Sequence, residues 1–150
     1  MTWNMDTKLT TTTLFEKVNL AAQGPVKWGT AIPDKSPGVY VVALSPDPNV
    51  VACEIEAEYL EPLERQRWMR NQPIVYIGQA TSQTLTTRLS QFYRHKYGAK
   101  SPHRGGQALK LLKCDLWVYW APCSEPRRCE SIMLREFENC TGRLPFANRT

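Results

Sequence analysis

The chain has 150 residues, of which 42% are hydrophobic and 22% are charged, and its formal net charge is +5. This length is typical of one domain, which buries roughly 70% of the surface that the extended chain would expose. No apolar run reaches the ~18 residues of a transmembrane helix, and the first residues lack the basic start and apolar segment of a signal peptide. We therefore expect a cytoplasmic protein with no membrane partner.

The first half of the chain predicts few regular elements. Residues 1–13, rich in threonine, are expected to be loose, and residues 13–22 are expected to form a short helix that Gly24-Pro25 ends. Residues 38–44 predict a strand, and the proline-rich residues 45–49 predict a turn. A β segment near residues 50–55 and a helix near residues 59–70, with Pro62 in its first turn, are expected to follow.

The second half is more regular. Leu85, Leu89 and Phe92 recur at helical spacing and predict a helix over residues 84–95. Ser124 is expected to cap the last helix, with Pro126 early in it and Gly142 beyond its end. A strand is predicted over residues 74–77 and another over residues 115–120. Between the helix at 84–95 and this second strand, a loop is predicted over residues 97–106 and a short helix over residues 107–113. The pattern predicts a small α/β protein of the α+β sandwich type, a short sheet with helices around it.

Five cysteines are present, at positions 53, 114, 123, 129 and 140. An odd number, in a chain without an expected export signal, favours reduced thiols over a disulfide framework. No pair has the Cys-x-x-Cys spacing of a zinc knuckle. An adaptor protein stabilised by zinc, bound by cysteines near the last helix, stays open as an alternative.

Positive charge is concentrated in the second half of the chain. Residues 1–84 carry 7 basic and 9 acidic residues, whereas residues 85–150 carry 12 basic and 5 acidic residues. Residues 88–113 contain both histidines and no acid. Such a block fits a surface that faces phosphates, although a merely solvated basic face would look the same. The candidate nucleic-acid contacts are Arg94, Lys96, Lys100, Arg104 and Lys110.

One acid and one arginine lie at unusual positions on their predicted helices. At about 100° per residue, Glu130 lies in the middle of the apolar stripe that includes Met133 and Phe137. An inward carboxylate is costly unless it pairs with a cation or binds a metal, and both explanations are open. Arg88 lies at the rim of the apolar face of helix 84–95, from which its planar guanidinium could bind a phosphate.

The order of several residues resembles the GIY-YIG nuclease superfamily. The matching elements are Gly38-Val39-Tyr40, then Tyr76-Ile77-Gly78, then Arg88, Glu130 and Asn148. The resemblance covers roughly residues 38–148, and five elements in the family's order are more specific than either triplet alone. It implies one domain with a three-stranded antiparallel sheet, an N-terminal helix extension over residues 1–37 and an insertion over about residues 45–72.

The resemblance also implies an activity and a role for each residue. The activity is hydrolysis of DNA phosphodiester bonds by an endonuclease that uses one divalent cation, Mg²⁺ or Mn²⁺. Tyr40 would be the general base, and Tyr76 would orient the attacking water and hydrogen-bond toward Tyr40. Arg88 would hold the scissile phosphate. Glu130 would be the metal's only protein ligand, and Asn148 would brace the site by hydrogen bonds.

Two positions depart from the family pattern. The family often has Tyr or His four positions after the arginine, where this chain has Phe92, so His95 and His103 become candidates for the missing polar role. Gln79 stands where a basic residue is usual. Position 78 is expected to require glycine, because a side chain there would crowd the phosphate. These departures support a second interpretation, a catalytically degenerate nucleic-acid-binding module with the same fold.

The insertion over about residues 45–72 is also where a partner protein or a second copy of the chain could dock.

Overall fold

The structure is a computed structural model that describes residues 9–53, 60, 62–94, 109 and 112–148. Bounds can be given for four helices and four strands within these residues, which confirms the mixed α/β class. In chain order the elements are α1 (Thr11–Glu16), β1 (Gln23–Lys27), β2 (Gly38–Ala43), α2 (Pro62–Arg67), β3 (Ile74–Ala80), α3 (Leu85–Arg94), β4 (Trp117–Pro122) and α5 (Pro126–Thr141).

The four strands form one antiparallel sheet in the order β1-β4-β2-β3. The prediction of three strands is therefore wrong. The additional strand, β1, contains the Gly24-Pro25 pair that was expected only to end a helix. Proline lacks a backbone N–H and is tolerated in an edge strand such as this one, where the register also shifts between Gln23 and Val26. Residues 23–27 thus belong to the sheet.

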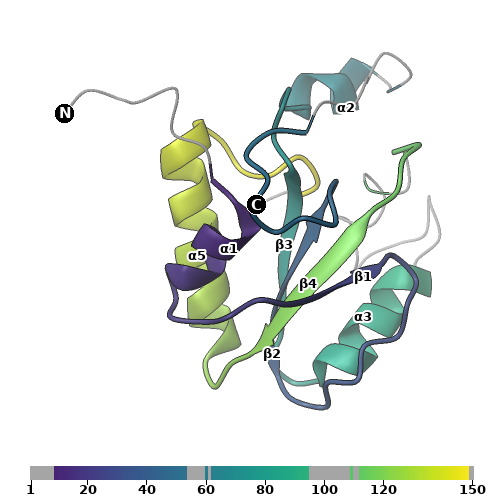
Figure 1. Cartoon of the computed structure of the whole chain (residues 1–150), viewed down its shortest axis with the longest axis vertical. Helices are drawn as coiled ribbons and strands as arrows, with labels where there is room; N and C mark the ends of the chain where they lie inside the picture. The colour runs from purple at the N-terminus through teal and green to yellow at the C-terminus, as the bar shows by residue number, and fades with distance from the viewer. Residues whose placement is uncertain (1–8, 54–59, 61, 95–108, 110–111, 149–150) are drawn as a thin grey trace.

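Helices cover both faces of the sheet, with α3 on one side and α1 and α5 on the other (Figure 1). The α3 face buries alternate residues of β2, Tyr40 and Val42, against the predicted apolar side of α3. The opposite face buries the intervening residues, among them Val41, under α1 and α5. All six residues of β2 are buried, because the central strand is covered on both faces.

The predicted boundaries of α3 and α5 agree closely with the structure. Gly142 ends α5 with φ = 92°, a left-handed conformation that glycine adopts without strain, and its N–H donates to the Glu138 carbonyl at 2.8 Å. The N-cap of α5 is Glu125, which makes no side-chain capping bond, so the prediction of Ser124 as the cap is wrong. Pro126 occupies the first helical position as expected.

The N-terminal helix lies earlier in the chain than predicted. Thr10 caps α1, and its side chain and that of Thr13 each accept a hydrogen bond from the other's backbone N–H at 3.0 Å. Residues 9–13, expected to be loose, are therefore ordered, and Leu9 is buried. The helix ends at Glu16 with Lys17 as its C-cap, and Asn19 then adopts a left-handed φ of 59°.

A hydrogen bond joins the two ends of the insertion between β2 and β3, and the insertion packs against the C-terminal segment. Leu44 donates to the Pro73 carbonyl at 2.9 Å, which continues the pairing of the two strands. Residues 50–53 form no strand, and residues 54–59 lie outside the described part. Trp68, just after α2, meets Phe146 edge-on at 5.1 Å between ring centroids. None of the described helices is long and apolar enough to cross a bilayer.

Candidate active site

Tyr40 lies at the centre of β2, directly opposite Gly78 of β3. Its side chain is completely buried, and its ring extends across the glycine. A Cβ atom on residue 78 would lie 2.5 Å from Tyr40 Cζ and 2.6 Å from its hydroxyl oxygen. Gly78 is therefore required to make room for the Tyr40 phenol, and the expectation that it makes room for a phosphate is not needed to explain it.

The Tyr40 hydroxyl is buried and makes no hydrogen bond of standard geometry with the described residues, although Arg88 lies close enough to act on it as a hydrogen-bond donor. Burial raises the pKa of Tyr40 well above its ordinary value of 10, and the nearby Tyr76 phenol adds to the rise. Arg88 acts in the opposite direction and lowers this pKa. A buried hydroxyl without a well-formed hydrogen bond is uncommon, and a bound water, an ion or a catalytic role can explain it.

Tyr76 lies beside Tyr40 on the α3 face of the sheet. Its ring stacks on Phe92 at 5.0 Å with an interplanar angle of 24°, and lies 6.0 Å from the Tyr40 ring. Burial raises the pKa of Tyr76, Glu130 raises it further, and Arg88 and Tyr40 lower it. The expected Tyr76–Tyr40 hydrogen bond is not formed with standard geometry, although the two phenols are close enough to influence each other's pKa.

Arg88 and Glu130 approach the two tyrosines from different helices. Arg88 lies on α3 and is half-buried, as expected for a residue at the rim of the apolar face. Glu130 lies on α5, one turn before the buried Met133, and is also half-buried. Because β3 is the outer strand of the sheet, groups from helices on both faces can meet beside it.

These four side chains form one electrostatic cluster. Burial raises the pKa of the Glu130 carboxyl, and Arg88 lowers it. Glu130 in turn raises the pKa of both Tyr40 and Tyr76, and Arg88 lowers both. Every pair among the four groups therefore interacts. The structure brings together residues from β2, β3, α3 and α5 that are separated by up to 90 positions in the sequence.

Asn148 supports this cluster from the C-terminal segment. It is buried, its side-chain oxygen accepts from the Ile77 N–H at 3.0 Å, and its amide nitrogen donates to the Ile77 carbonyl at 2.9 Å. Arg67 Nη1 donates to the Asn148 carbonyl at 3.1 Å. The side chain thus holds the backbone between Tyr76 and Gly78. These hydrogen bonds are of the kind that the resemblance implies for Asn148, whose role in a reaction stays a prediction.

Replacing Asn148 with leucine is expected to destabilise the protein by about 2–4 kcal/mol. The near-isosteric side chain leaves the Ile77 N–H and carbonyl buried without partners, each at a cost of about 1–3 kcal/mol. Urea unfolding would measure the change in the free energy of unfolding. Asn139→Leu, at an exposed position on α5, is the matched control and should change stability by less than about 0.5 kcal/mol. Equal effects of the two variants would contradict the bracing role.

The other predicted site residues are only partly described. His95, His103, Lys96, Lys100, Arg104 and Lys110 lie outside the described residues. Arg94 is exposed at the end of α3. Gln79 accepts a hydrogen bond from the Thr81 hydroxyl at 2.5 Å, and strand alternation turns it away from the side of Tyr76 and Gly78.

Two features of the region were not predicted from the sequence. Phe92, treated as a departure from a polar pattern, packs against Tyr40 at 5.9 Å as well as against Tyr76. Its place on the apolar side of α3, with Leu85 and Leu89, was the available signal. The second feature is the contact of Cys123 with Cys129 at the start of α5. A spacing of six residues across a strand-to-helix junction has no periodic signature.

Comparisons of the chain with protein-family models, with characterised proteins and with solved structures find no significant match. The described residues contain no group of three His, Cys, Asp or Glu side chains that could hold a metal ion. What the cluster can do must therefore follow from its own composition: two buried phenols, one guanidinium and one partly desolvated carboxylate.

Proposed function

We propose that this protein is a GIY-YIG-type endonuclease that hydrolyses DNA phosphodiester bonds with one divalent cation, Mg²⁺ or Mn²⁺. The observation that carries the proposal is the meeting of Tyr40, Tyr76, Arg88 and Glu130 in one electrostatic cluster. A structural ion pair would require only the arginine and the glutamate. The two phenols, which also pack in the core, add to such a pair a candidate base and a group that can orient water.

The reaction assigned to the cluster is in-line hydrolysis. The Tyr40 phenolate accepts a proton from water, the water oxygen forms a bond to phosphorus, and the bond from phosphorus to the leaving oxygen breaks. Tyr76 orients the water, and Arg88 donates hydrogen bonds to the phosphate oxygens on which negative charge accumulates. Tyr40 must lose its proton first. Its raised pKa therefore makes added positive charge near the phenol a requirement of this mechanism.

Glu130 is the residue that would hold the metal ion. Its carboxylate is a hard oxygen ligand of the kind that Mg²⁺ prefers, and its raised pKa shows that the charged form lacks solvation that a cation would restore. A single carboxylate also fits the habit of Mg²⁺ to keep several waters and to bind substrate phosphate. When bound, the ion would stabilise negative charge on the phosphate and the leaving oxygen.

The direct test is incubation of the purified protein with supercoiled, linear, branched and single-stranded DNA, with Mg²⁺ and with Mn²⁺ in turn. Nicking or cleavage that requires the metal and is stopped by a chelator supports the proposal. No product from any DNA form with either metal would count against it.

Tyr40→Phe is expected to lower the cleavage rate at least about 10²-fold with little loss of stability, because the removed hydroxyl is a base in the reaction and makes no hydrogen bond of standard geometry with the described residues. Since the Tyr40 pKa lies well above 10, the wild-type rate should rise about tenfold per pH unit between pH 7 and 9. This slope should be absent from the variant. Initial rates of plasmid nicking across this pH range would measure it.

Tyr119→Phe is the matched control for Tyr40→Phe. Tyr119 lies on β4, and its hydroxyl donates to the Ser45 carbonyl at 2.9 Å. This variant should lose about 1 kcal/mol of stability but retain the rate and its pH slope. A Tyr40→Phe enzyme with the wild-type rate and slope would exclude Tyr40 as the base.

A second candidate is a degenerate nucleic-acid-binding module that retains the fold without the chemistry. The observation that favours it is the complete burial of Tyr40 under an aromatic contact with Phe92, which keeps the phenol neutral. Such a module would shift DNA in a gel with an affinity that falls as salt rises, and would yield no cleavage product with either metal.

A further inference from the structure

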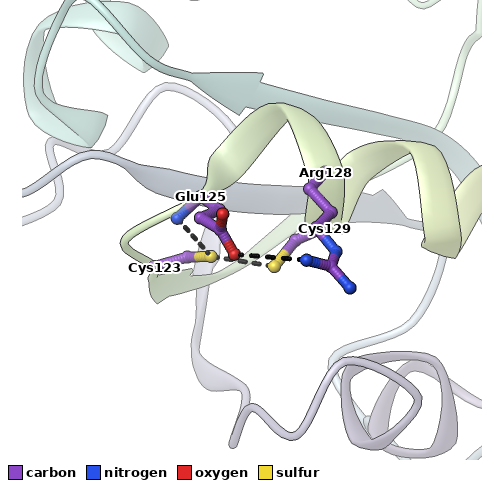
Figure 2. A network of polar contacts seen from close by, with 4 residues as sticks. All are labelled: Cys123, Glu125, Arg128 and Cys129. Atoms are coloured by element: carbon purple, nitrogen blue, oxygen red, sulfur yellow. Dashed lines mark hydrogen bonds and ion pairs between the residues drawn. The ribbon is translucent and has the colours of Figure 1, made fainter.

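Two cysteines meet at the junction between β4 and α5. Cys123 directly follows β4, and Cys129 lies in the first turn of α5, with the two Sγ atoms 2.8 Å apart (Figure 2). A disulfide has an S–S distance of about 2.05 Å, so the sulfur atoms need to approach by only about 0.8 Å to bond. The other three cysteines do not take part in this contact.

The backbone on both sides of the pair is held in place. The Cys123 N–H donates to the Pro37 carbonyl at 3.0 Å, and the Cys129 N–H donates to the Glu125 carbonyl at 3.0 Å. The Glu125 N–H donates to Cys123 Sγ at 3.4 Å. The two thiols therefore meet because the fold positions them, and bond formation requires little further ordering of the chain.

The pair is accessible and chemically asymmetric. Both cysteines are half-buried, whereas Glu125 and Arg128, which flank them in Figure 2, are exposed. Cys123 Sγ already accepts the hydrogen bond from the Glu125 N–H, so Cys123 is the thiol suited to attack first.

We propose that Cys123 and Cys129 are a redox-active dithiol that is oxidised to an intramolecular disulfide by a low-molecular-weight disulfide of the glutathione class. The Cys123 thiolate attacks one sulfur of the small disulfide, forms a mixed disulfide and releases one small thiol. The Cys129 thiolate, after losing its proton to solvent, attacks the Cys123 sulfur and releases the second small thiol. The protein loses two electrons and two protons, which the small disulfide gains.

Oxidation also bears on the candidate active site, in a part of the inference that rests on the proposed function. Glu130 directly follows Cys129, so the movement that closes the disulfide acts on the helical turn that carries the candidate metal ligand. Displacement of a catalytic group by about 1 Å can lower a rate up to about 10²-fold. We expect the oxidised protein to cleave DNA at least about threefold more slowly, with full recovery after reduction by dithiothreitol.

The test is incubation of the reduced full-length protein with oxidised glutathione at pH 8, followed by alkylation and intact mass under denaturing conditions. The expected product has lost two hydrogen atoms, binds alkylating agent at three of its five cysteines, and yields a linked Cys123–Cys129 peptide. Its Tm should rise by roughly 5 °C, because a disulfide restricts the unfolded chain. Neither readout needs nuclease activity, so failure of the proposed function would leave this result intact.

The variants make the outcome specific. Cys129→Ser should accumulate a stable glutathione adduct on Cys123 without ring closure, whereas Cys140→Ser, elsewhere on α5, should form the disulfide as the wild type does. A wild-type protein that stops at the adduct, links other cysteines or does not react would overturn the proposal. Stoichiometric zinc bound through this pair in the purified protein would overturn it as well.

Discussion

Glu130→Gln is expected to reduce metal-dependent DNA cleavage by roughly 10²- to 10³-fold and, without metal, to raise the Tm by a few degrees at pH 7. The loss of rate follows because glutamine replaces the only carboxylate in the cluster of Tyr40, Tyr76, Arg88 and Glu130 with a neutral amide. The gain in stability follows because the wild-type carboxylate is partly desolvated. Plasmid nicking and thermal unfolding measure the two effects on the same preparations.

The sign of the stability effect follows from proton linkage. The pKa of Glu130 is raised in the folded state, so between the unfolded value near 4.5 and the folded value the folded protein binds more protons than the unfolded chain. Stability contributed by this group is therefore present at acid pH and is lost as the pH rises through the folded pKa. Above the folded pKa the charged carboxylate opposes folding, and glutamine removes that cost.

Glu138→Gln, an exposed position on the same helix, is the matched control and should change neither the rate nor the Tm. Mg²⁺ should raise the Tm of the wild type but not that of Glu130→Gln, because the ion stabilises only a state that binds it. A variant that retains cleavage, or whose Tm responds to Mg²⁺ as the wild type does, would show that Glu130 is not the ligand.

Gly78→Ala is expected to have a large effect on the fold near the site, a loss of roughly 3 kcal/mol and a fall in Tm of several degrees. The added methyl group would meet the Tyr40 ring at 2.5 Å and its hydroxyl at 2.6 Å, inside a buried face where the ring cannot move freely. Displacement of Tyr40 should also abolish cleavage. Urea unfolding and plasmid nicking would measure these effects.

Two comparisons isolate the clash at Gly78. Gly29→Ala adds a methyl group with no atom within 4 Å, at a glycine with φ = 94°, so it should cost only about 1–2 kcal/mol of backbone strain. In a Tyr40→Ala background the ring is absent, and Gly78→Ala should then cost little. Equal costs of Gly78→Ala in the presence and absence of the Tyr40 ring would refute the steric explanation.

The elements that were predicted well are those with a strong local pattern. Helix α3 repeats apolar residues at the helical period, and α5 has proline at its start and glycine at its end. The convergence of Tyr40, Tyr76, Arg88 and Glu130 was expected from the order of the residues and from two facts about the helices, the inward acid and the rim arginine. Their catalytic roles remain predictions.

The features that were missed depend on contacts between distant segments. Local sequence predicts that Pro25 ends a helix. Only the position of β1 at the edge of the sheet makes a proline acceptable in that strand. The need for glycine at position 78 depends on the register that places it opposite Tyr40. The Cys123–Cys129 contact likewise depends on the angle between β4 and α5. The periodicity of a single sequence does not show which residues of two strands pair, which strand lies at the edge of the sheet, or how a strand and a helix meet.

The hydrogen bonds of Asn148 have a consequence for how this protein meets others. An exposed outer strand is a template on which a strand of another molecule can pair, and it promotes aggregation. Beside β3, the Ala147 N–H donates to the Val75 carbonyl at 2.9 Å. The Asn148 side chain accepts from the Ile77 N–H and donates to the Ile77 carbonyl. The C-terminal segment thus occupies the place of a neighbouring strand. A second copy of the chain therefore cannot pair a strand with β3 at Val75 and Ile77 while these hydrogen bonds are in place.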